Sequence, residues 1–333
     1  MPKARPPRRF VDTGPPLPLS MKTRRDFIKT GLALGAGFSF LDLGGVFAAE
    51  TAPLPAGPQA PGAARPLLVA VRDGDRVAML NKALETLGGI GAFVKPGQTV
   101  LIKPNMGWDA PPERGANTHP DLVRHLVTLC REAGAKSVSI FDNTCDQWER
   151  CYANSGIAEA GRAAGAIIVN GKDESLYRET AIPRGVKLRA AKIHSLVLDS
   201  DVFINVPVLK HHSGSLMTAS MKNLMGVIWD RRIYHRTDLH QCIADLLTVR
   251  QPALNIVDAY HPMVRNGPRG KTTDDLIEMR TLLASSDIVA IDTAAAKLLG
   301  HQPDQVTHVK LAAAMNLGRS DLEQVDIRRF KLA

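Results

Sequence analysis

The stretch TVLIKPNMGWDAPPERGANTHPDLVRHLVTLCREAGAKSVSIFDN, residues 99–143, contains a complete strand–helix–strand unit. The apolar run Thr99–Ile102 predicts a buried strand, and the 3.6-residue apolar repeat of Pro120–Ala133 predicts a helix. Ser137–Phe141 predicts the next strand, since Gly134 provides a suitable end for the helix before it. This order is typical of an α/β fold with a parallel or mixed sheet.

The start of that helix carries its own signals. Thr118 and Asp121 stand three residues apart, as in a capping box, and Pro120 suits the first helical turn. We therefore expect the helix to begin immediately after Thr118.

The same alternation continues along the chain. Further strands are predicted at Leu67–Val71, Ala166–Val169, Val202–Val206 and Leu254–Val257, and further helices at Arg76–Leu87, Ile157–Ala164, Leu239–Val249 and Ile288–Leu299. Several of these strands are apolar throughout, as strands covered on both faces must be. The sequence predicts one α/β domain over residues 67–333, with a mixed or mostly parallel central sheet and helices on both faces.

The N-terminal region has the pattern of an export signal. Lys22–Lys29 (KTRRDFIK) places two adjacent arginines ahead of a weakly apolar segment, which is typical of a twin-arginine signal. Thr30–Phe47 is rich in glycine and broken by Asp42, so it suits a removable leader better than a stable membrane anchor. Small residues predict cleavage near Ala48. We expect a periplasmic or otherwise exported protein, with the twin-arginine translocation machinery as a partner.

Residues 1–48 therefore comprise an N-terminal extension and a signal peptide, with Met1 and Met21 both open as the true start. Residues 49–66 are rich in Ala, Pro and Gly and predict a flexible linker.

Much of the chain's positive charge lies in this leader. The chain has 42 Lys and Arg against 33 Asp and Glu; residues 1–48 hold eight and three of these, which leaves 34 against 30, a net charge of +4. No basic run interleaved with aromatic residues remains, and this argues against nucleic-acid binding as the main function.

Polar residues follow four of the predicted strands. They are Lys103 and Asn105, then Asp142, then Lys210 and His211, and finally Asp258. The carboxyl ends of parallel strands meet at one edge of a sheet, so these side chains are predicted to line a single crevice. Each residue alone could instead form a turn, cap a helix or lie in solvent.

The segment 210–226 is the most unusual local sequence. If a helix begins near Ser215, Lys222 points back toward Lys210 and His211. Several cationic groups in one concavity suit the carboxylate or phosphate of a small anionic ligand. The alternative is that the methionines of this segment pack into the core and its lysines are solvated.

Four separated motifs together resemble one family. They are Lys103–Asn105, Pro112–Pro120, Lys210 and His212 with Lys222–Gly226 downstream, and Ser285–Asp292. This combination looks like the domain-of-unknown-function 362 (DUF362) family, over roughly residues 69–300. The resemblance implies no defined activity. Some relatives carry an added ferredoxin-like domain with cysteine-ligated iron–sulfur clusters, but this chain has no such cysteine-rich segment.

Our first functional hypothesis is an exported enzyme acting on a small anionic substrate. In this hypothesis Lys103, Lys210 and Lys222 hold or polarise the acidic group, Asn105 and Asn223 orient it, Asp258 and Arg269 complete the ligand site, and Asp142 or His211 acts as acid, base or metal ligand.

A metal ion is a possible cofactor in this reading. A composite site of His119, Asp142, Asp258 and one of His211 and His212 would offer nitrogen and oxygen ligands suited to iron, manganese or zinc. The second hypothesis is a non-catalytic periplasmic protein that carries a metal or another ligand in the same crevice.

The cysteines offer a third hypothesis. Cys145 and Cys151 could pair as a disulfide in an oxidising compartment, or hold an iron–sulfur cluster with a third ligand. Their spacing differs from familiar cluster motifs, so this redox reading ranks last.

Overall fold

The computed structural model describes residues 65–333. The expected export signal, its cleavage site and most of the linker lie outside these residues. The strands are β1 (Leu67–Arg72), β2 (Thr99–Pro104), β3 (Ser137–Ile140), β4 (Ile167–Ile168), β5 (Tyr177–Ala181), β6 (Ala190–His194), β7 (Val202–Val206), β8 (Val208–His212), β9 (Leu216–Thr218), β10 (Leu254–Met263), β11 (Thr281–Ser285) and β12 (Asp326–Lys331). The α-helices are α3 (Arg76–Thr86), α4 (Pro120–Glu132), α5 (Trp148–Asn154), α6 (Ile157–Ala163), α7 (Ser195–Asp199), α8 (Ser220–Asn223), α9 (Arg232–Arg236), α10 (Leu239–Leu246), α11 (Ile288–Leu298) and α12 (Thr307–Ala314).

The central sheet is mixed and mostly parallel, as the sequence predicted. Its strand order is β12-β1-β11-β10-β7-β2-β3-β4. β11 runs antiparallel to both β1 and β10, whereas the strands from β10 through β7, β2 and β3 to β4 are parallel to their neighbours. β8 branches from this path, pairing parallel with β10 and antiparallel with β9.

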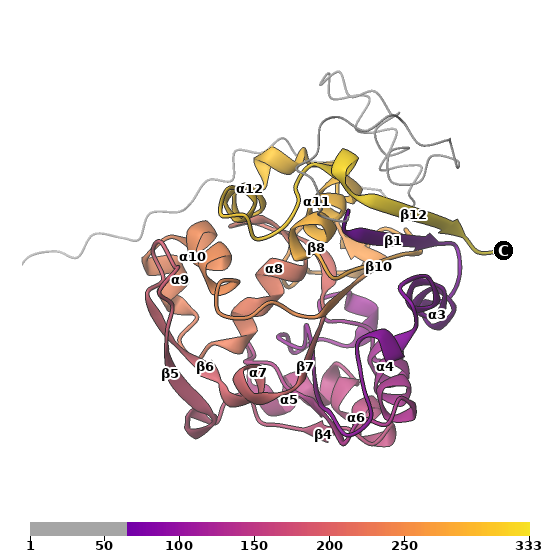
Figure 1. The fold of residues 1–333 in the computed structure, drawn as a ribbon, viewed down its shortest axis with the longest axis horizontal. Helices are drawn as coiled ribbons and strands as arrows, with labels where there is room; N and C mark the ends of the chain where they lie inside the picture. Colours follow the sequence, from indigo (N-terminus) through magenta and orange to yellow (C-terminus); the bar gives the residue numbers. More distant parts are fainter. Residues whose placement is uncertain (1–64) are drawn as a thin grey trace, which may run out of the picture.

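Helices cover both faces of the sheet, as Figure 1 shows. Alternate strand residues belong to opposite apolar clusters, since successive side chains of a strand point to opposite faces. Leu101 of β2 packs in the cluster that contains α10, α11 and α12, and Val100 and Ile102 pack in the cluster that contains α3, α4 and α6. The strands are therefore buried on both sides, which explains their unbroken apolar runs.

Two local predictions were wrong. Leu216–Thr218 forms strand β9, so the expected helix begins at Ser220 rather than near Ser215. Helix α4 is capped by His119, whose side chain accepts from the Asp121 N–H. The Thr118 hydroxyl instead donates to the Val206 carbonyl and ties the segment before α4 to the sheet.

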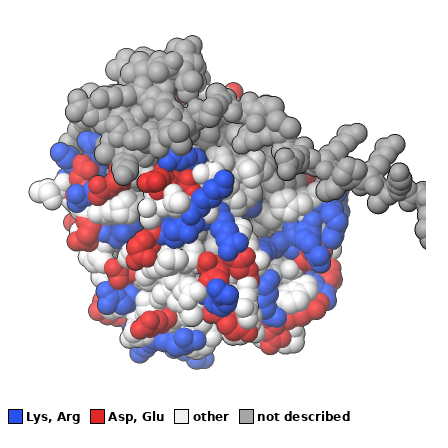
Figure 2. All heavy atoms as spheres, turned by 180° about the vertical axis from the view of Figure 1, so that it is seen from behind, with Lys and Arg blue, Asp and Glu red and all other residues white. Residues whose placement is uncertain are grey.

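The exposed surface gives no sign of a charge-selective face in the view of Figure 2, where basic and acidic side chains are interspersed. Among residues 65–333, no helix is both long and apolar enough to span a bilayer.

Candidate functional site

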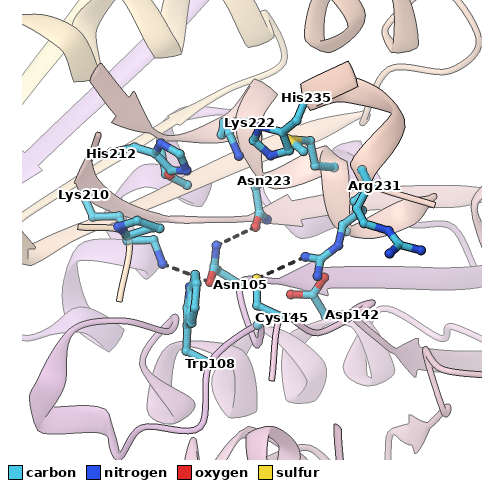
Figure 3. A pocket seen from close by; sticks show the side chains of 16 residues that line it. Asn105, Trp108, Asp142, Cys145, Lys210, His212, Lys222, Asn223, Arg231 and His235 are labelled. Carbon is cyan, nitrogen blue, oxygen red and sulfur yellow. Dashed lines mark hydrogen bonds between the residues drawn. The ribbon is translucent and has the colours of Figure 1, made fainter. Parts of the chain in front are cut away.

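A cavity of about 260 Å³ opens beyond the carboxyl ends of β2 and β3. Its lining comprises Asn105, Gly107, Trp108, Asp142, Cys145, Lys210, His212, Thr218, Lys222, Asn223, Met225, Gly226, Arg231, Arg232, His235 and Pro268. Figure 3 shows Lys210 and Trp108 on one side and Arg231 on the other, with Asn105 and Asn223 between them. The structure thus brings together several of the residues that the sequence placed at this edge.

A buried ion pair lies beside the cavity. Lys103 lies at the carboxyl end of β2. Its Nζ contacts Asp142 Oδ1 at 2.8 Å, and the other Asp142 oxygen accepts from the Met106 N–H at 2.8 Å. Lys103 also donates to the Pro104 carbonyl at 2.7 Å and to Asn223 Oδ1 at 3.2 Å. Burial lowers the pKa of Lys103, and the Asp142 carboxylate opposes that shift.

An amide network joins helix α8 to the ends of the strands. Asn105 Nδ2 donates to Asn223 Oδ1 at 3.0 Å, and Asn223 Nδ2 donates to Asn205 Oδ1 at 2.9 Å. Asn205 in turn donates to the Ser220 carbonyl at 3.0 Å. Since each amide can both donate and accept, the chain of bonds fixes α8 against β2 and β7.

Gly226 allows the chain to pass directly over the ion pair. A Cβ atom at this position would lie 1.9 Å from Asp142 Oδ1 and 2.9 Å from Lys103 Nζ, which no side chain could occupy. The Gly226 carbonyl also accepts from the Asn143 N–H at 2.9 Å. The Lys222–Gly226 motif therefore supplies two polar side chains, Lys222 and Asn223, and a glycine whose backbone must pass close to the ion pair.

Lys210, on β8, is almost fully buried in the cavity wall, at 1 % exposure. Its Nζ donates to Asn105 Oδ1 at 3.3 Å and to the Ala116 carbonyl, and it lies 5.8 Å from the centre of the Trp108 ring. Neither acceptor carries a charge. Burial lowers the pKa of Lys210 to about 7, and the charge of Lys222 contributes to this shift.

Two further cations of the lining lack a carboxylate partner. Lys222 is partly buried, and within residues 65–333 its Nζ makes no hydrogen bond or ion pair. Arg231 donates to Cys145 Sγ at 3.2 Å and to the Thr144 carbonyl. Burial lowers the pKa of Lys222 to about 8, with Arg231 adding to the effect.

Two histidines line the same cavity. Burial lowers the pKa of His212 to about 2, with Lys222 and Lys210 adding to the shift, and its Nδ1 accepts from the Gly214 N–H at 3.0 Å. His235 is exposed at the rim, and its pKa is also lowered, by partial burial and by Lys222. Both imidazoles are therefore neutral near pH 7, and the positive charge of the cavity comes from its lysines and arginines.

A carboxylate behind the cavity fixes the start of α8. Asp292, fully buried on α11, accepts from the Ser220 N–H at 2.7 Å and from the Met221 N–H at 2.9 Å. Burial raises the pKa of Asp292 to about 7, although these hydrogen bonds oppose the shift. The Ser285–Asp292 motif thus supports the site from the opposite helix, while Asp287 caps α11.

Asp258 does not belong to this cavity. Both of its oxygens lie 3.1 Å from Arg76 Nε, and they also accept from the His119 and Tyr260 N–H groups. Burial alone would raise the pKa of Asp258, but the Arg76 guanidinium and these hydrogen bonds hold it below its usual value. The Asp258 carboxylate is therefore paired and lies outside the cavity lining, where the sequence had placed it.

Three more predicted residues lie elsewhere. His119 caps α4, and His211 Nδ1 accepts from the Gly267 N–H at 3.2 Å. Arg269 is exposed and faces Asp146 at 3.6 Å. Its neighbour Pro268 lines the cavity, so the turn is close to the site although its arginine is not part of the lining.

The expected metal ligands and the two cysteines are dispersed in the structure. Among residues 65–333, no three His, Cys, Asp or Glu side chains are grouped so that they could hold a metal ion, so the structure does not bring His119, Asp142 and Asp258 together as the expected composite site. Cys145 and Cys151 are free thiols, so the expected disulfide is not formed. Cys145 lines the cavity, whereas Cys151 is buried in α5.

Several lining residues carry no distinctive signal in the sequence. Arg231 and Trp108 lie in irregular segments and carry no pattern that distinguishes them from surface residues. A dibasic pair at Arg231 and Arg232 was the available signal for the cationic rim, but charged pairs are common on surfaces.

Residues 100–297 match the sequence pattern of the family described as domain of unknown function (DUF362). The chain belongs to the DUF362 family. A curated DUF362-like relative, the Thylakoid-associated protein sll1697 of Synechocystis sp., is 29% identical over 253 residues, which cover 74% of this chain and 76% of that protein.

Two solved structures match the DUF362 chain at low TM-scores. They are the lactate racemase apoprotein from Thermoanaerobacterium thermosaccharolyticum (TM-score 0.40, 10% identity, 75% of this chain and 57% of that one) and a protein from Thermotoga maritima (TM-score 0.42, 10% identity, 73% and 60%). The chain spans less than two thirds of the length of either structure.

Proposed function

We propose that this DUF362 protein is an exported enzyme that binds a small anionic substrate in the cavity beyond β2 and β3. The observation that carries the proposal is the charge imbalance of the lining. Among residues 65–333, Lys210, Lys222 and Arg231 have no carboxylate partner, and Asp142, the one carboxylate that these residues contribute to the lining, is neutralised by Lys103. Uncompensated cations in a partly desolvated cavity favour a carboxylate or phosphate ligand.

The surrounding groups supply orientation and proton transfer. Asn105 and Asn223 present fixed amides to the cavity, and their mutual hydrogen bond sets their positions before a ligand arrives. Lys210, with a pKa of about 7, can either accept or donate a proton near neutral pH.

Native purification of the full chain tests this proposal. Mass spectrometry of the small molecules that co-purify should recover an acid or phosphate, and its affinity should fall at least about tenfold in Arg231→Met, a loss of about 1.4 kcal/mol. Arg236→Met is the matched control, since Arg236 lies on the neighbouring helix but pairs with Asp230 outside the cavity. Equal affinity in both variants contradicts the proposed site, and a ligand that is bound but never converted favours a carrier over an enzyme.

Export by the twin-arginine route is the second part of the proposal, supported by the Arg24-Arg25 pair ahead of a weakly apolar segment. Cell fractionation should find the chain outside the cytoplasm, and the double change Arg24→Lys and Arg25→Lys should retain it inside. Unchanged location in that variant would refute this route.

A further inference from the structure

The three lysines around the cavity differ in what their amines contact. Lys103 Nζ lies against a carboxylate, whereas Lys222 Nζ has no acceptor within the described chain. Lys210 Nζ is intermediate, because it contacts only two neutral oxygens, Asn105 Oδ1 and the Ala116 carbonyl. The three lysine amines therefore have three different environments: one paired with a carboxylate, one bonded only to neutral oxygens, and one without an acceptor among the described residues.

The number of acceptors around each lysine nitrogen indicates whether it is an ammonium or a neutral amine. A lysine ammonium has three N–H donors, whereas a neutral amine has two and a free electron pair. Lys103 has three acceptors, namely Asp142, Pro104 and Asn223, which is the complement of an ammonium. Lys210 has two acceptors, which use both hydrogens of a neutral amine and leave its electron pair available in the cavity wall.

The charges that face Lys210 favour the same state. It is 1 % exposed, with Lys222 and Lys103 as neighbouring cations and with Asp142 and Cys145 as the opposing groups. Burial is the main cause that lowers the pKa of Lys210 to about 7. At neutral pH, the Lys210 amine is therefore unprotonated in about half of the molecules. Lys222, with a pKa of about 8, remains mostly protonated there.

We propose that Lys210 is a nucleophile that forms an imine with its substrate, and that the substrate is a small acid bearing a ketone or aldehyde, an oxo acid. This inference rests on the proposed function and narrows its substrate class. Arg231 and Lys222 hold the acid group, and the Lys210 amine meets the carbonyl carbon.

The step is balanced without an added oxidant or reductant. The Lys210 nitrogen forms a bond to the carbonyl carbon, and one amine proton passes to the carbonyl oxygen. That oxygen takes a second proton from solvent and leaves as water, which gives a protonated C=N bond. The resulting cation lies beside the Trp108 ring, 5.8 Å from Nζ in the free enzyme, where the face of the indole stabilises positive charge. A protonated imine withdraws electrons from the adjacent carbon more strongly than a carbonyl does.

Borohydride trapping with pyruvate as the probe tests the inference on the full chain. Reduction of the imine leaves a stable secondary amine, and peptide mapping should find the adduct on Lys210. Lys210→Arg should lose this adduct, whereas Lys95→Arg, a change at an exposed lysine, should retain it. Adduct on Lys222, or equal labelling of Lys95 and Lys210 in the wild type, would overturn the assignment.

Propionate, which has the same chain length as pyruvate but no carbonyl, separates the two proposals. If both acids bind in an Arg231-dependent manner and pyruvate leaves no adduct, the imine is refuted and the anion site stands. If neither binds and no adduct forms, both proposals are refuted.

The pH dependence adds a readout that a structural lysine would not give. The trapping rate should rise about tenfold from pH 6 to pH 8 and then level off, because only the unprotonated amine attacks. A rate that does not change over this range would contradict Lys210 as the nucleophile.

Discussion

Asp142 and Asp258 are buried equally, at 3 % exposure each, yet they lie in regions of opposite character. Asp142 pairs with Lys103 at 2.8 Å beside an open cavity in which Lys210, Lys222 and Arg231 have no carboxylate partner among residues 65–333. Asp258 pairs with Arg76 at 3.1 Å, and that guanidinium packs over the Tyr260 ring at 4.3 Å, with no charge left over. A buried ion pair is therefore not a functional signal by itself; the uncompensated charge beside it is.

The largest expected effect comes from breaking the Asp142 pair. Asp142→Ala leaves the Lys103 ammonium buried without its carboxylate, which should cost about 3–5 kcal/mol in the free energy of unfolding. Urea denaturation measures the loss. The double variant Lys103→Met with Asp142→Ala should recover part of it, and a loss below about 1 kcal/mol in the single variant would show that the pair is solvated.

Breaking the Asp258 pair should cost less. Asp258→Ala should lose about 2–3 kcal/mol of stability, since Arg76 is 15 % exposed and its freed guanidinium can reach water. Because Asp258 lies outside the cavity, pyruvate binding measured by calorimetry should stay unchanged. Asp121→Ala, at an exposed carboxylate, is the control for both measurements. Loss of pyruvate binding in Asp258→Ala would show that the Asp258–Arg76 pair and the cavity are coupled.

The buried amine of Lys210 in the cavity wall should make the stability of the protein depend on pH. The pKa of Lys210 falls from 10.5 to about 7 on folding, so between these values the unfolded chain binds a proton that the folded chain does not. The contribution of Lys210 to stability therefore rises with pH in this window and is lowest below pH 7. Relative to Lys210→Met, the wild type should gain about 2 kcal/mol between pH 7 and pH 9, measured by denaturation at each pH. A constant difference would place Lys210 in a solvated state.

Removing the unpartnered cation should have the smallest energetic effect. Lys222→Met deletes a charge without breaking an internal bond, so stability should change by less than about 0.5 kcal/mol. Affinity for pyruvate should still fall about tenfold, or about 1.4 kcal/mol. Lys95→Met provides the exposed control. A large loss of stability in Lys222→Met would indicate a structural role instead.

The sequence predicted the parts of the fold that depend on local pattern. The six expected strands and five expected helices are all present, because unbroken apolar runs and amphipathic repeats record burial directly. The short strands β8 and β9 were missed, since Lys210–His212 is polar and its pairing depends on the distant β10. β11 (Thr281–Ser285) was also missed, although all five of its residues are buried.

Part of the site was also predictable, because the topology of a parallel sheet brings some of its residues together. Lys103 and Asn105 lie at the carboxyl end of β2, and Asp142 follows the parallel neighbouring strand β3, so their convergence follows from topology. Asp258 lies within β10, which continues to Met263, and its partner Arg76 comes from α3, so no local signal showed that it would be paired. Lys222 lines the cavity although its helix begins at Ser220 rather than near Ser215. Either helix start places Lys222 after β8 and facing the same strand ends, so this prediction did not depend on the exact start.

The anchoring of α8 by Asp292 sets a condition on how the protein is made. Asp292 lies 72 residues after Ser220, whose N–H it receives, and α11 is among the last elements of the chain. A nascent polypeptide that has left the ribosome only as far as residue 280 already contains every lining residue but lacks the carboxylate that holds Lys222 and Asn223 in position. The start of α8 is thus secured only after residue 292 has been synthesised, long after the residues that line the cavity.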